Sequence, residues 1–496
     1  MKFRNYMLGA GLGLALAATS CKKVLNVTPE YALDGSQIFT SLTDYEYSLT
    51  GTYSLLRQNG YYGNGSTGTG AWSSLPDMMG DDLLQTNEDL GNYGRLSNYT
   101  FTPNETTVAT AWTAAYNVVT QANITLRGID RYQSASSTKV NRIKGQALAL
   151  RAMVHFDLLR YWGNDFDRNS TGLGIPYVTE VNAFAKPARL TVKDTYDRIF
   201  ADLTAAEALL ADVDAPINSA SSKANIDLTA VRALLARVYL YSKNYAQAEA
   251  YATQVISATP LASAANFASI WKDGSQAGVI FALVYSNVAE GNPNAQVHTA
   301  SLNRNAYRPT AGFINLFADK TADVRYSVNV AGRSTGTGAA IVTDPSSTIG
   351  RKIVNKHIGK GTSVDNVVNW KVVRTGEMYL IRAEARAMQQ GKETLALADL
   401  NSLRAARISN YTAVNLSGQA LIDAIFTERR KELFAEGHRW FDLKRTTRTI
   451  TRTDNTGAFS GVQLSLASSS KVWVFPIPQG EIDANPNIRS QQSPGW

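Results

Sequence analysis

Residues 229–258 read TAVRALLARVYLYSKNYAQAEAYATQVISA, and this stretch indicates the fold of the chain. Apolar and small residues recur every three or four positions on both sides of a short turn, Lys243-Asn244-Tyr245. That spacing predicts two amphipathic helices packed as a hairpin. Ala236, Tyr239 and Ala248 stand where a tetratricopeptide unit places its small and aromatic packing residues. Ordinary helix-hairpin packing would use the same residues, so both interpretations give an α-helical hairpin.

The same periodicity recurs along the chain. Residues 377–404 form a looser second copy of the hairpin. Four other segments repeat apolar residues at helical spacing: Leu42 to Leu56, Trp112 to Ile129, Ile143 to Leu158, and Val192 to Leu210. The second and third of these read as an antiparallel hairpin, and the fourth follows a capping box, Thr191 to Asp194. We therefore predict a mainly α fold built from tetratricopeptide-like hairpins.

Two regions interrupt the helical pattern, residues 58–105 and 260–370, where glycine, serine, threonine and asparagine are frequent. Both are predicted to be long loops with a few short strands, of which Val279 to Val284 is one candidate. Val472 to Pro478, near the end of the chain, is also strand-like. Long loops in a compact domain are usually functional, so we expect the ligand face there.

The N-terminus has the features of a signal peptide. Lys2 and Arg4 precede an apolar stretch from Met7 to Ala18, whose 12 residues are too few to cross a bilayer. The stretch ends in small residues directly before Cys21, which is the only cysteine of the chain. We predict a signal peptide over residues 1–20, and an intramolecular disulfide is impossible.

Cys21 follows the apolar stretch as the acylated cysteine of a bacterial lipobox does. Two or more acyl chains would give a stable membrane anchor; the alternative is a signal peptide followed by a bystander cysteine. Residues 21–34, which include Pro29 and several turn formers, read as the lipid anchor and tether. A single domain is expected over residues 35–496.

The charge pattern argues against a nucleic-acid partner. Loss of Lys2 and Arg4 with the signal peptide lowers the formal net charge from +8 to +6 (8 − 2), and acids are interspersed with the bases. The most charged segment, Glu428 to Asp442, alternates acids and bases at helical spacing. It predicts intramolecular ion pairs on a packed helix that ends at Gly437.

Two glycine motifs have the residue spacing of a catalytic or cofactor-binding motif, but the elements expected around them differ from those that such a motif requires. Gly63 to Gly68 has the G-x-G-x-x-G spacing, but a helix precedes it and Pro76 soon follows, so a dinucleotide site is rejected. Gly332 to Gly336 has the G-x-S-x-G spacing around Ser334, after a strand candidate at Tyr326 to Val330. A nucleophile elbow must lead into a helix, and a hairpin is expected here instead.

Metal and acid chemistry is also weakly indicated. The four histidines, His155, His298, His357 and His438, have no helical metal-ligand spacing, so no metal or other cofactor is predicted. Several acids crowd one short region: Asp77, Asp81, Asp82, Glu88 and Asp89. Such a group can serve calcium or glycoside hydrolysis, but a solvated acidic loop is the commoner outcome.

Aromatic and polar residues of the loops are the better candidates for ligand contacts. Aromatic faces stack on the apolar faces of sugars, while amide, carboxylate and guanidinium groups bind hydroxyls. The alternative for each residue is packing of the loop onto the body. The ligand-binding candidates are Tyr61, Tyr62, Trp72, Asp77, Tyr93, Tyr285, Tyr307 and Arg308.

The chain resembles the SusD/RagB outer-membrane lipoproteins of Bacteroidetes over essentially all of residues 21–496. The matching segments, in chain order, are Cys21 to Pro29, Trp112-x3-Tyr116 with Ala122-Asn123, Leu150-Arg151-Ala152 with Phe156 and Gly163, Arg189 to Val192, Arg374 with Glu377 to Leu380, Ala383-Glu384-Ala385, Glu428 to Leu443, Phe475 to Pro478, Asn485-Pro486 and Pro494-Gly495-Trp496.

The resemblance implies an α-helical scaffold with a loop-built ligand face. It also implies a TonB-dependent outer-membrane transporter of the SusC type as partner, to which the protein delivers oligosaccharides or peptides without catalysis. Asn26 replaces a common aspartate, and Lys22-Lys23 stand where acids often mark surface export, so the side of the membrane stays open. The alternatives are a surface glycan hydrolase or esterase using Asp81 or Ser334, and a helical scaffold without a small ligand.

Overall fold

The computed structural model describes residues 38–63, 70–91, 93–213, 215–287, 290, 297–299, 304–332 and 352–496. The predicted signal peptide, Cys21, the tether and Ser334 lie outside the described residues. Contacts divide the chain into one unit that ends at Tyr47 and a second unit from Ser48 to Trp496. The predicted boundaries of a single domain, residues 35–496, remain a prediction.

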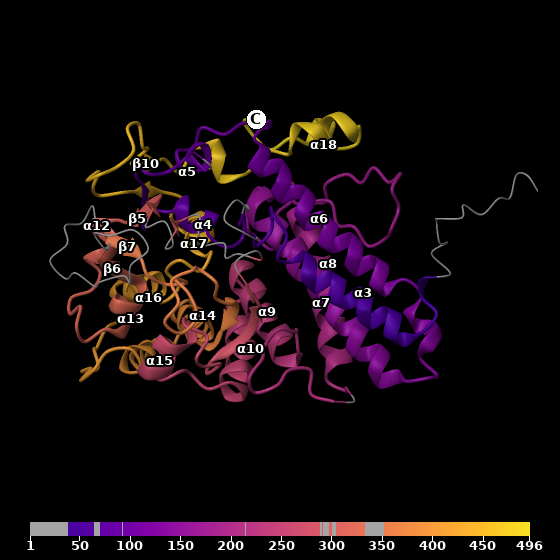
Figure 1. The fold of residues 1–496 in the computed structure, drawn as a ribbon, viewed down its shortest axis with the longest axis horizontal. Helices are drawn as coiled ribbons and strands as arrows, with labels where there is room; N and C mark the ends of the chain where they lie inside the picture. Colours follow the sequence, from indigo (N-terminus) through magenta and orange to yellow (C-terminus); the bar gives the residue numbers. More distant parts are fainter. Residues whose placement is uncertain are drawn as a thin grey trace, which may run out of the picture. The chain divides into compact units, whose positions relative to one another are not determined.

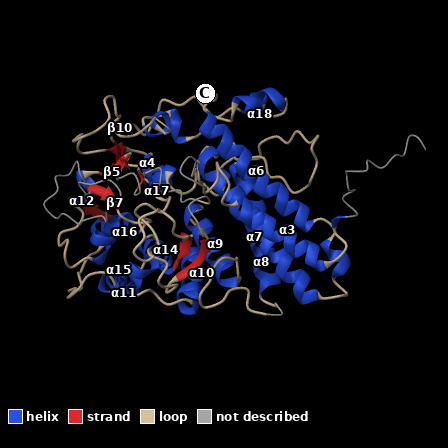
Figure 2. Cartoon of the chain, viewed as in Figure 1, coloured by secondary structure: helices blue, strands red, loops and turns tan. Residues whose placement is uncertain are grey.

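Helices dominate the described residues (Figure 1, Figure 2). The longer helices are α3 (Leu42–Leu55), α6 (Thr106–Leu126), α7 (Ser137–Trp162), α8 (Val192–Leu210), α9 (Leu228–Tyr241), α10 (Tyr245–Ala258), α14 (Thr375–Ala387), α15 (Glu393–Ala405) and α16 (Gly418–Glu432). The shorter ones are α4 (Leu75–Met78), α5 (Gly94–Ser97), α11 (Ala264–Ile270), α12 (Ala311–Ile314), α13 (Val324–Asn329), α17 (Arg439–Arg445) and α18 (Gln479–Ala484). In this part of the chain, no helix combines the length and the hydropathy that a membrane crossing requires.

The strands are short and antiparallel, and Figure 2 shows them set among loops. The pairs are β1 (Leu83–Gln85) with β5 (Tyr307–Pro309), β2 (Val279–Leu283) with β8 (Trp370–Arg374), β3 (His298–Thr299) with β4 (Arg304–Asn305), β6 (Val330–Gly332) with β7 (Lys352–Val354), and β9 (Ile450–Thr451) with β10 (Ser465–Leu466). The predicted strand at Val279 is confirmed. The three short helices α11, α12 and α13 were not anticipated between residues 260 and 370, because each is too short to show a helical period.

The predicted mainly α fold is confirmed, and its long helices pack in chain order. Figure 1 shows α6, α7 and α8 side by side, and contacts continue from α8 through α9 and α10 to α14, which also packs on α15 and α16. In the α9–α10 hairpin, Lys243 adopts a φ of 59° and the Asn244 side chain accepts a hydrogen bond from the Gln247 N–H, so the second helix starts at once. Ala236 and Ala248 are fully buried at this contact, as their small size predicted.

The start of α8 is also as predicted. Thr191 is the N-cap residue, and its Oγ1 accepts a 3.0 Å hydrogen bond from the Asp194 N–H while donating to Asp194 Oδ2 at 2.8 Å. The cap satisfies one of the N–H groups that the first turn of a helix leaves unpaired. The helix then buries Tyr196, Ile199 and Leu203 on one face.

The segment Glu428 to Asp442 is not one helix. Helix α16 ends at Glu432, Ala435 has a φ of 57°, and α17 starts at Arg439. Gly437 lies in the turn between the two helices with a φ of +81°, and a Cβ there would approach the Trp72 carbonyl oxygen to 2.4 Å. Glycine is needed here because the backbone at residue 437 lies against the backbone at Trp72. The prediction that Gly437 ends the helix was wrong, since α16 ends at Glu432.

The ion pairs of this segment are intramolecular, as predicted, but most of them join it to distant elements and not to residues one helical turn away. The fully buried Glu432 carboxylate contacts Arg325 at 3.4 Å, Arg374 at 2.6 Å and Arg407 at 3.0 Å. These arginines belong to α13, to the last residue of β8 and to the loop after α15. Gly376 leaves room for this cluster, since a Cβ there would lie 2.5 Å from Glu432 Oε1.

Three further expectations were wrong. Val472 to Pro478 forms no strand; a 3-10 helix covers Lys471–Trp473, and Pro476 and Pro478 lack the N–H groups that a strand ladder needs. Tyr326 to Val330 is mostly α13 rather than strand. Asp77, Asp81 and Asp82 do not form a solvated loop; all three are at most 8% exposed, and Asp81 and Asp82 pair with Arg439 and Arg430.

The buried cluster makes Glu432 a test of stability. We expect Glu432→Gln to lower the free energy of unfolding by about 3–5 kcal/mol, because it removes a buried negative charge that three buried arginines share. Asp423→Asn is the matched control, since Asp423 is an exposed acid of the same helix, bonded to Gln419. Urea unfolding measures both variants; equal stabilities would contradict the role of Glu432.

His155 predicts a pH dependence. It is fully buried, its Nε2 accepts a 3.1 Å hydrogen bond from the Val178 N–H, and burial lowers its pKa from 6.5 to about 3. Below pH 6.5 this histidine is therefore largely protonated in the unfolded chain but stays neutral in the folded chain. The free energy of unfolding falls as the pH falls, because the unfolded state binds the additional proton. Between pH 6.5 and 4.5 the wild type should lose roughly 2.5 kcal/mol more than His155→Gln, measured by urea unfolding. Parallel losses in the two proteins would refute this assignment.

Candidate functional site

The eight residues expected to contact a ligand are all buried. None exposes more than 3% of its surface: Tyr61, Tyr62, Trp72, Asp77, Tyr93, Tyr285, Tyr307 and Arg308. The side chains therefore hold the loops onto the body in this structure. Their assignment as ligand contacts remains a prediction.

Tyr61, Tyr62 and Trp72 form one aromatic cluster. The ring centroid of Tyr61 lies 5.1 Å from that of Tyr62 and 4.7 Å from that of Trp72. Tyr61 Oη donates to Asp157 Oδ2 at 2.5 Å, and Trp72 Nε1 donates to the Asp157 carbonyl at 3.1 Å. The cluster thus anchors the first loop region to helix α7.

Three other candidates are engaged in internal hydrogen bonds. Asp77 Oδ2 accepts from the Gly437 N–H at 2.6 Å, and burial raises the pKa of this carboxyl well above its ordinary value. Tyr307 Oη donates to Ser97 Oγ at 3.0 Å. Arg308 donates to the carbonyls of Thr456 and Pro309 and pairs with Asp454. These contacts join the two loop regions to the C-terminal segment.

Tyr285 lies where the two loop regions meet. Its Oη donates to the Gly63 carbonyl at 2.8 Å, and the guanidinium carbon of Arg57 lies 5.9 Å from its ring centroid. Arg57 belongs to the turn after α3 and lines a cavity of about 450 Å³. We call this cavity the Arg57 hollow; it is lined by Thr50, Tyr53, Ser54, Arg57, Ala224, Asn225, Leu283, Val284, Ser286 and Glu290.

The hollow joins segments that are distant in sequence. Thr50, Tyr53 and Ser54 lie on α3, Ala224 and Asn225 precede α9, and the last four residues end or follow β2. Tyr53 is partly exposed, while its hydroxyl accepts from the Ile226 N–H at 2.8 Å and donates to Gln146 at 2.6 Å. These two hydrogen bonds hold the ring in place at the wall of the hollow.

One ion pair crosses the hollow. Arg57 Nη1 donates to the Val284 carbonyl at 2.7 Å and lies 3.2 Å from Glu290 Oε1, and about a third of each side chain is exposed. Hydrogen bonds from Ser286, with the charge of Arg57, hold the pKa of Glu290 below its ordinary value. Glu290 is therefore a carboxylate at neutral pH, and the hollow presents one positive and one negative group.

The hollow offers the chemistry that hydroxyl-bearing ligands require. It combines an aromatic ring and aliphatic side chains with a guanidinium, a carboxylate, an amide and hydroxyls, which can bind both faces and edges of a sugar. The sequence-based candidates did not include Tyr53, Arg57, Asn225 or Glu290. Tyr53 and Arg57 stand four positions apart, at the end of a predicted helix. This spacing places both side chains on one face of the helix, and it was the feature of the sequence that could have indicated the site.

The groups proposed for an enzyme are engaged elsewhere. Asp81 is bound through both oxygens by Arg439, at 2.6 and 2.9 Å; burial opposes ionisation, but Arg439 brings the pKa of Asp81 below its ordinary value. Ser334 lies outside the described residues. Among the residues that the structure covers, no three His, Cys, Asp or Glu side chains are grouped to hold a metal ion.

Two family models match this chain. One describes the SusD family and matches residues 343–496; the other is described as starch-binding associating with outer membrane and matches residues 41–240. Two SusD-like proteins of Formosa agariphila, P38 and P25, are 23% and 22% identical to the chain. The first alignment covers 90% of this chain and 93% of the relative, and the second covers 90% of each.

Solved structures agree with these matches. A SusD superfamily protein from Bacteroides thetaiotaomicron has a TM-score of 0.79 at 26% identity, covering 92% of this chain and 100% of the other. A putative sugar binding protein from Bacteroides vulgatus has a TM-score of 0.75 at 26% identity, covering 92% and 99%. The fold is thus mainly helical and tetratricopeptide-like, as in these proteins. The chain belongs to the SusD family.

The burial of Trp72 predicts a structural effect. We expect Trp72→Ala to lower the free energy of unfolding by about 3–5 kcal/mol, because a fully packed indole is removed from the aromatic cluster. Phe184→Ala is the control, since that ring is 90% exposed, and its effect should stay within about 0.5 kcal/mol. Thermal or urea unfolding tests both; an unchanged stability of Trp72→Ala would mean that the indole is free for another role.

Proposed function

We propose that this chain is an outer-membrane lipoprotein that captures oligosaccharides in the Arg57 hollow and hands them to a TonB-dependent transporter. The single observation that carries the proposal is the Arg57 hollow, with its aromatic wall and paired polar groups, in a chain of the SusD family. The description of the matched family model supports starch or a related glycan as the class of ligand.

Attachment to the membrane is assigned to Cys21, through acyl chains on the thiol and on the new amine. An anchored body of this kind stays beside a transporter in the same membrane, which favours handover over release into solution. The partner is a transporter of the SusC type, and the surface-exposed side of the outer membrane is the location that fits nutrient capture. Closure over a transporter requires that the ligand contacts the closed state better than the open one.

The ligand contacts we place first are at the exposed rim of the hollow, from Arg57, Ser54, Asn225 and Glu290. Behind this rim, the ring of Tyr285 lies near the Arg57 guanidinium, and the Tyr285 hydroxyl donates to the Gly63 carbonyl, next to Tyr62. Binding without catalysis fits this arrangement, because glycoside hydrolysis ordinarily uses two carboxyl groups and Glu290 is the one acid among the described residues that line the hollow. No bond of the ligand is made or broken.

The test is isothermal titration calorimetry of the full chain in detergent against maltoheptaose, a panel of plant, host and microbial oligosaccharides, and peptides. We expect one class of glycan to bind, and Arg57→Ala to weaken its Kd tenfold or more, because a charged hydrogen bond contributes about 1.5–3 kcal/mol. Arg198→Ala, an exposed arginine on α8, is the matched control and should leave the Kd unchanged.

The recovered ligand separates the alternatives. A glycan recovered intact agrees with capture alone, whereas shortened fragments would identify a hydrolase. Peptide binding without glycan binding would change the class of ligand. Absence of heat with every compound, together with isolation of a transporter complex, would favour a helical scaffold without a small ligand.

A further inference from the structure

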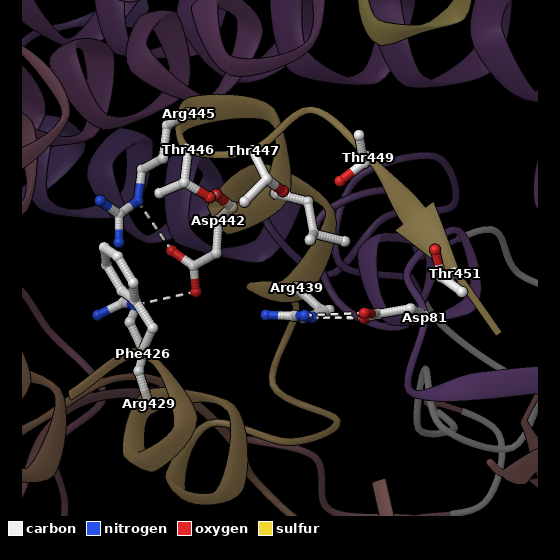
Figure 3. A pocket seen from close by; sticks show the side chains of 11 residues that line it. Asp81, Phe426, Arg429, Arg439, Asp442, Arg445, Thr446, Thr447, Thr449 and Thr451 are labelled. Atoms are coloured by element: carbon white, nitrogen blue, oxygen red, sulfur yellow. Dashed lines mark hydrogen bonds and ion pairs between the residues drawn. The ribbon is translucent and has the colours of Figure 1, made fainter. Parts of the chain in front are cut away.

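A second cavity lies apart from the Arg57 hollow and shares no residue with it. It has a volume of about 260 Å³ and is built by α16, α17, the segment that follows α17, and Asp81. We call it the Asp442 pocket (Figure 3); its lining residues are Asp81, Phe426, Arg429, Arg439, Asp442, Leu443, Arg445, Thr446, Thr447, Thr449 and Thr451.

The carboxylates of this pocket are fixed in position. Figure 3 shows Asp442 between two arginines, and its oxygens accept from Arg429 Nε at 2.8 Å and from Arg445 Nε at 2.9 Å. Asp81 is held by Arg439 through both oxygens. Groups that are already oriented bind a ligand at a lower entropic cost.

Arg429 has two buried donors that no protein group among the described residues accepts from. Its side chain is 2% exposed, and neither Nη1 nor Nη2 has a hydrogen-bond partner in the structure. The nearest acid, Glu377 Oε1, is 4.0 Å from Nη2, which is beyond hydrogen-bond distance. Buried donors without acceptors are costly, and a hydroxyl oxygen, whether of a ligand or of water, would satisfy these two groups.

The side chains at the mouth of the pocket and its balance of charges indicate the class of ligand that it would bind. Thr446, Thr447, Thr449 and Thr451 are exposed at the mouth, and Phe426 and Leu443 provide apolar surface. Arg429, Arg439 and Arg445 are balanced by Asp81, Asp442 and Glu384, which binds Arg445 bidentately. Because the positive and negative groups cancel, a neutral ligand with several hydroxyls fits better than an anion.

We infer that the Asp442 pocket is a second binding site for one neutral pyranose unit of a glycan. Ring hydroxyls accept from Arg429 and donate to Asp81 or Asp442, the threonines bind further hydroxyls, and Phe426 covers an apolar face. The inference rests on the proposed function only for the class of ligand, since its residues are independent of the Arg57 hollow.

The test uses the full chain in detergent and a panel of single sugars: glucose, galactose, mannose, xylose, fucose and glucuronic acid. Saturation-transfer NMR identifies the sugar that binds, and titration gives its Kd. We expect a neutral sugar to bind, and the double variant Thr447→Val with Thr449→Val to weaken it about tenfold or more. Thr453→Val is the control on the same exposed segment, and Arg57→Ala should also leave this Kd unchanged.

The inference would be overturned if no neutral sugar showed saturation transfer, or if glucuronic acid alone bound. It would also be overturned if Arg57→Ala abolished sugar binding while the threonine double variant bound normally. A crystal soaked with the bound sugar that showed only water beside Arg429 would contradict it as well. Failure here is distinct from failure of the proposed function, because the latter is tested by oligosaccharide binding in Arg57→Ala. Both threonines are exposed, so the variant is expected to fold normally.

Discussion

The carboxylate of Glu432 is the contact on which the arrangement of the second half of the chain depends. A charge removed from water must be paired, and here one carboxylate pairs with Arg325, Arg374 and Arg407, which are themselves almost fully buried. Arg374 also binds both oxygens of Glu436, and Arg407 donates to the Ala262 carbonyl. Segments that are distant in sequence are thereby fixed to the end of α16.

This cluster determines where the loops leave the scaffold. Arg374 is the last residue of β8 and is paired in register with Val279, the first residue of β2. Strand β2 then runs to Leu283, and Val284, the next residue, is held by Arg57 at the hollow. The position of Val284 at the Arg57 hollow thus depends on the buried ion cluster, because the β2–β8 strand pair connects the two. The cluster itself does not line the hollow.

The sequence and the structure differ most at the site. Helical hairpins were predictable because apolar residues must recur once per turn to be buried, and Ala236 and Ala248 are buried as that rule requires. Aromatic residues in loops have no such rule, because the same Tyr61 or Trp72 can face a ligand or the core. The Arg57 hollow joins Tyr53, Asn225 and Glu290 from three segments, and no pattern within one segment reveals that meeting.

By itself, the sequence determined the class of fold, the hairpins, the cap at Thr191 and the family, because each depends on residues close together in the chain or on ordered motifs. Only the tertiary structure decided that Asp77, Asp81 and Asp82 are buried, that the segment from Glu428 breaks at Glu432, and that Arg429 keeps two buried donors unpaired. The reason is physical: burial and ion pairing are set by which distant segments meet, and local sequence does not encode those partners.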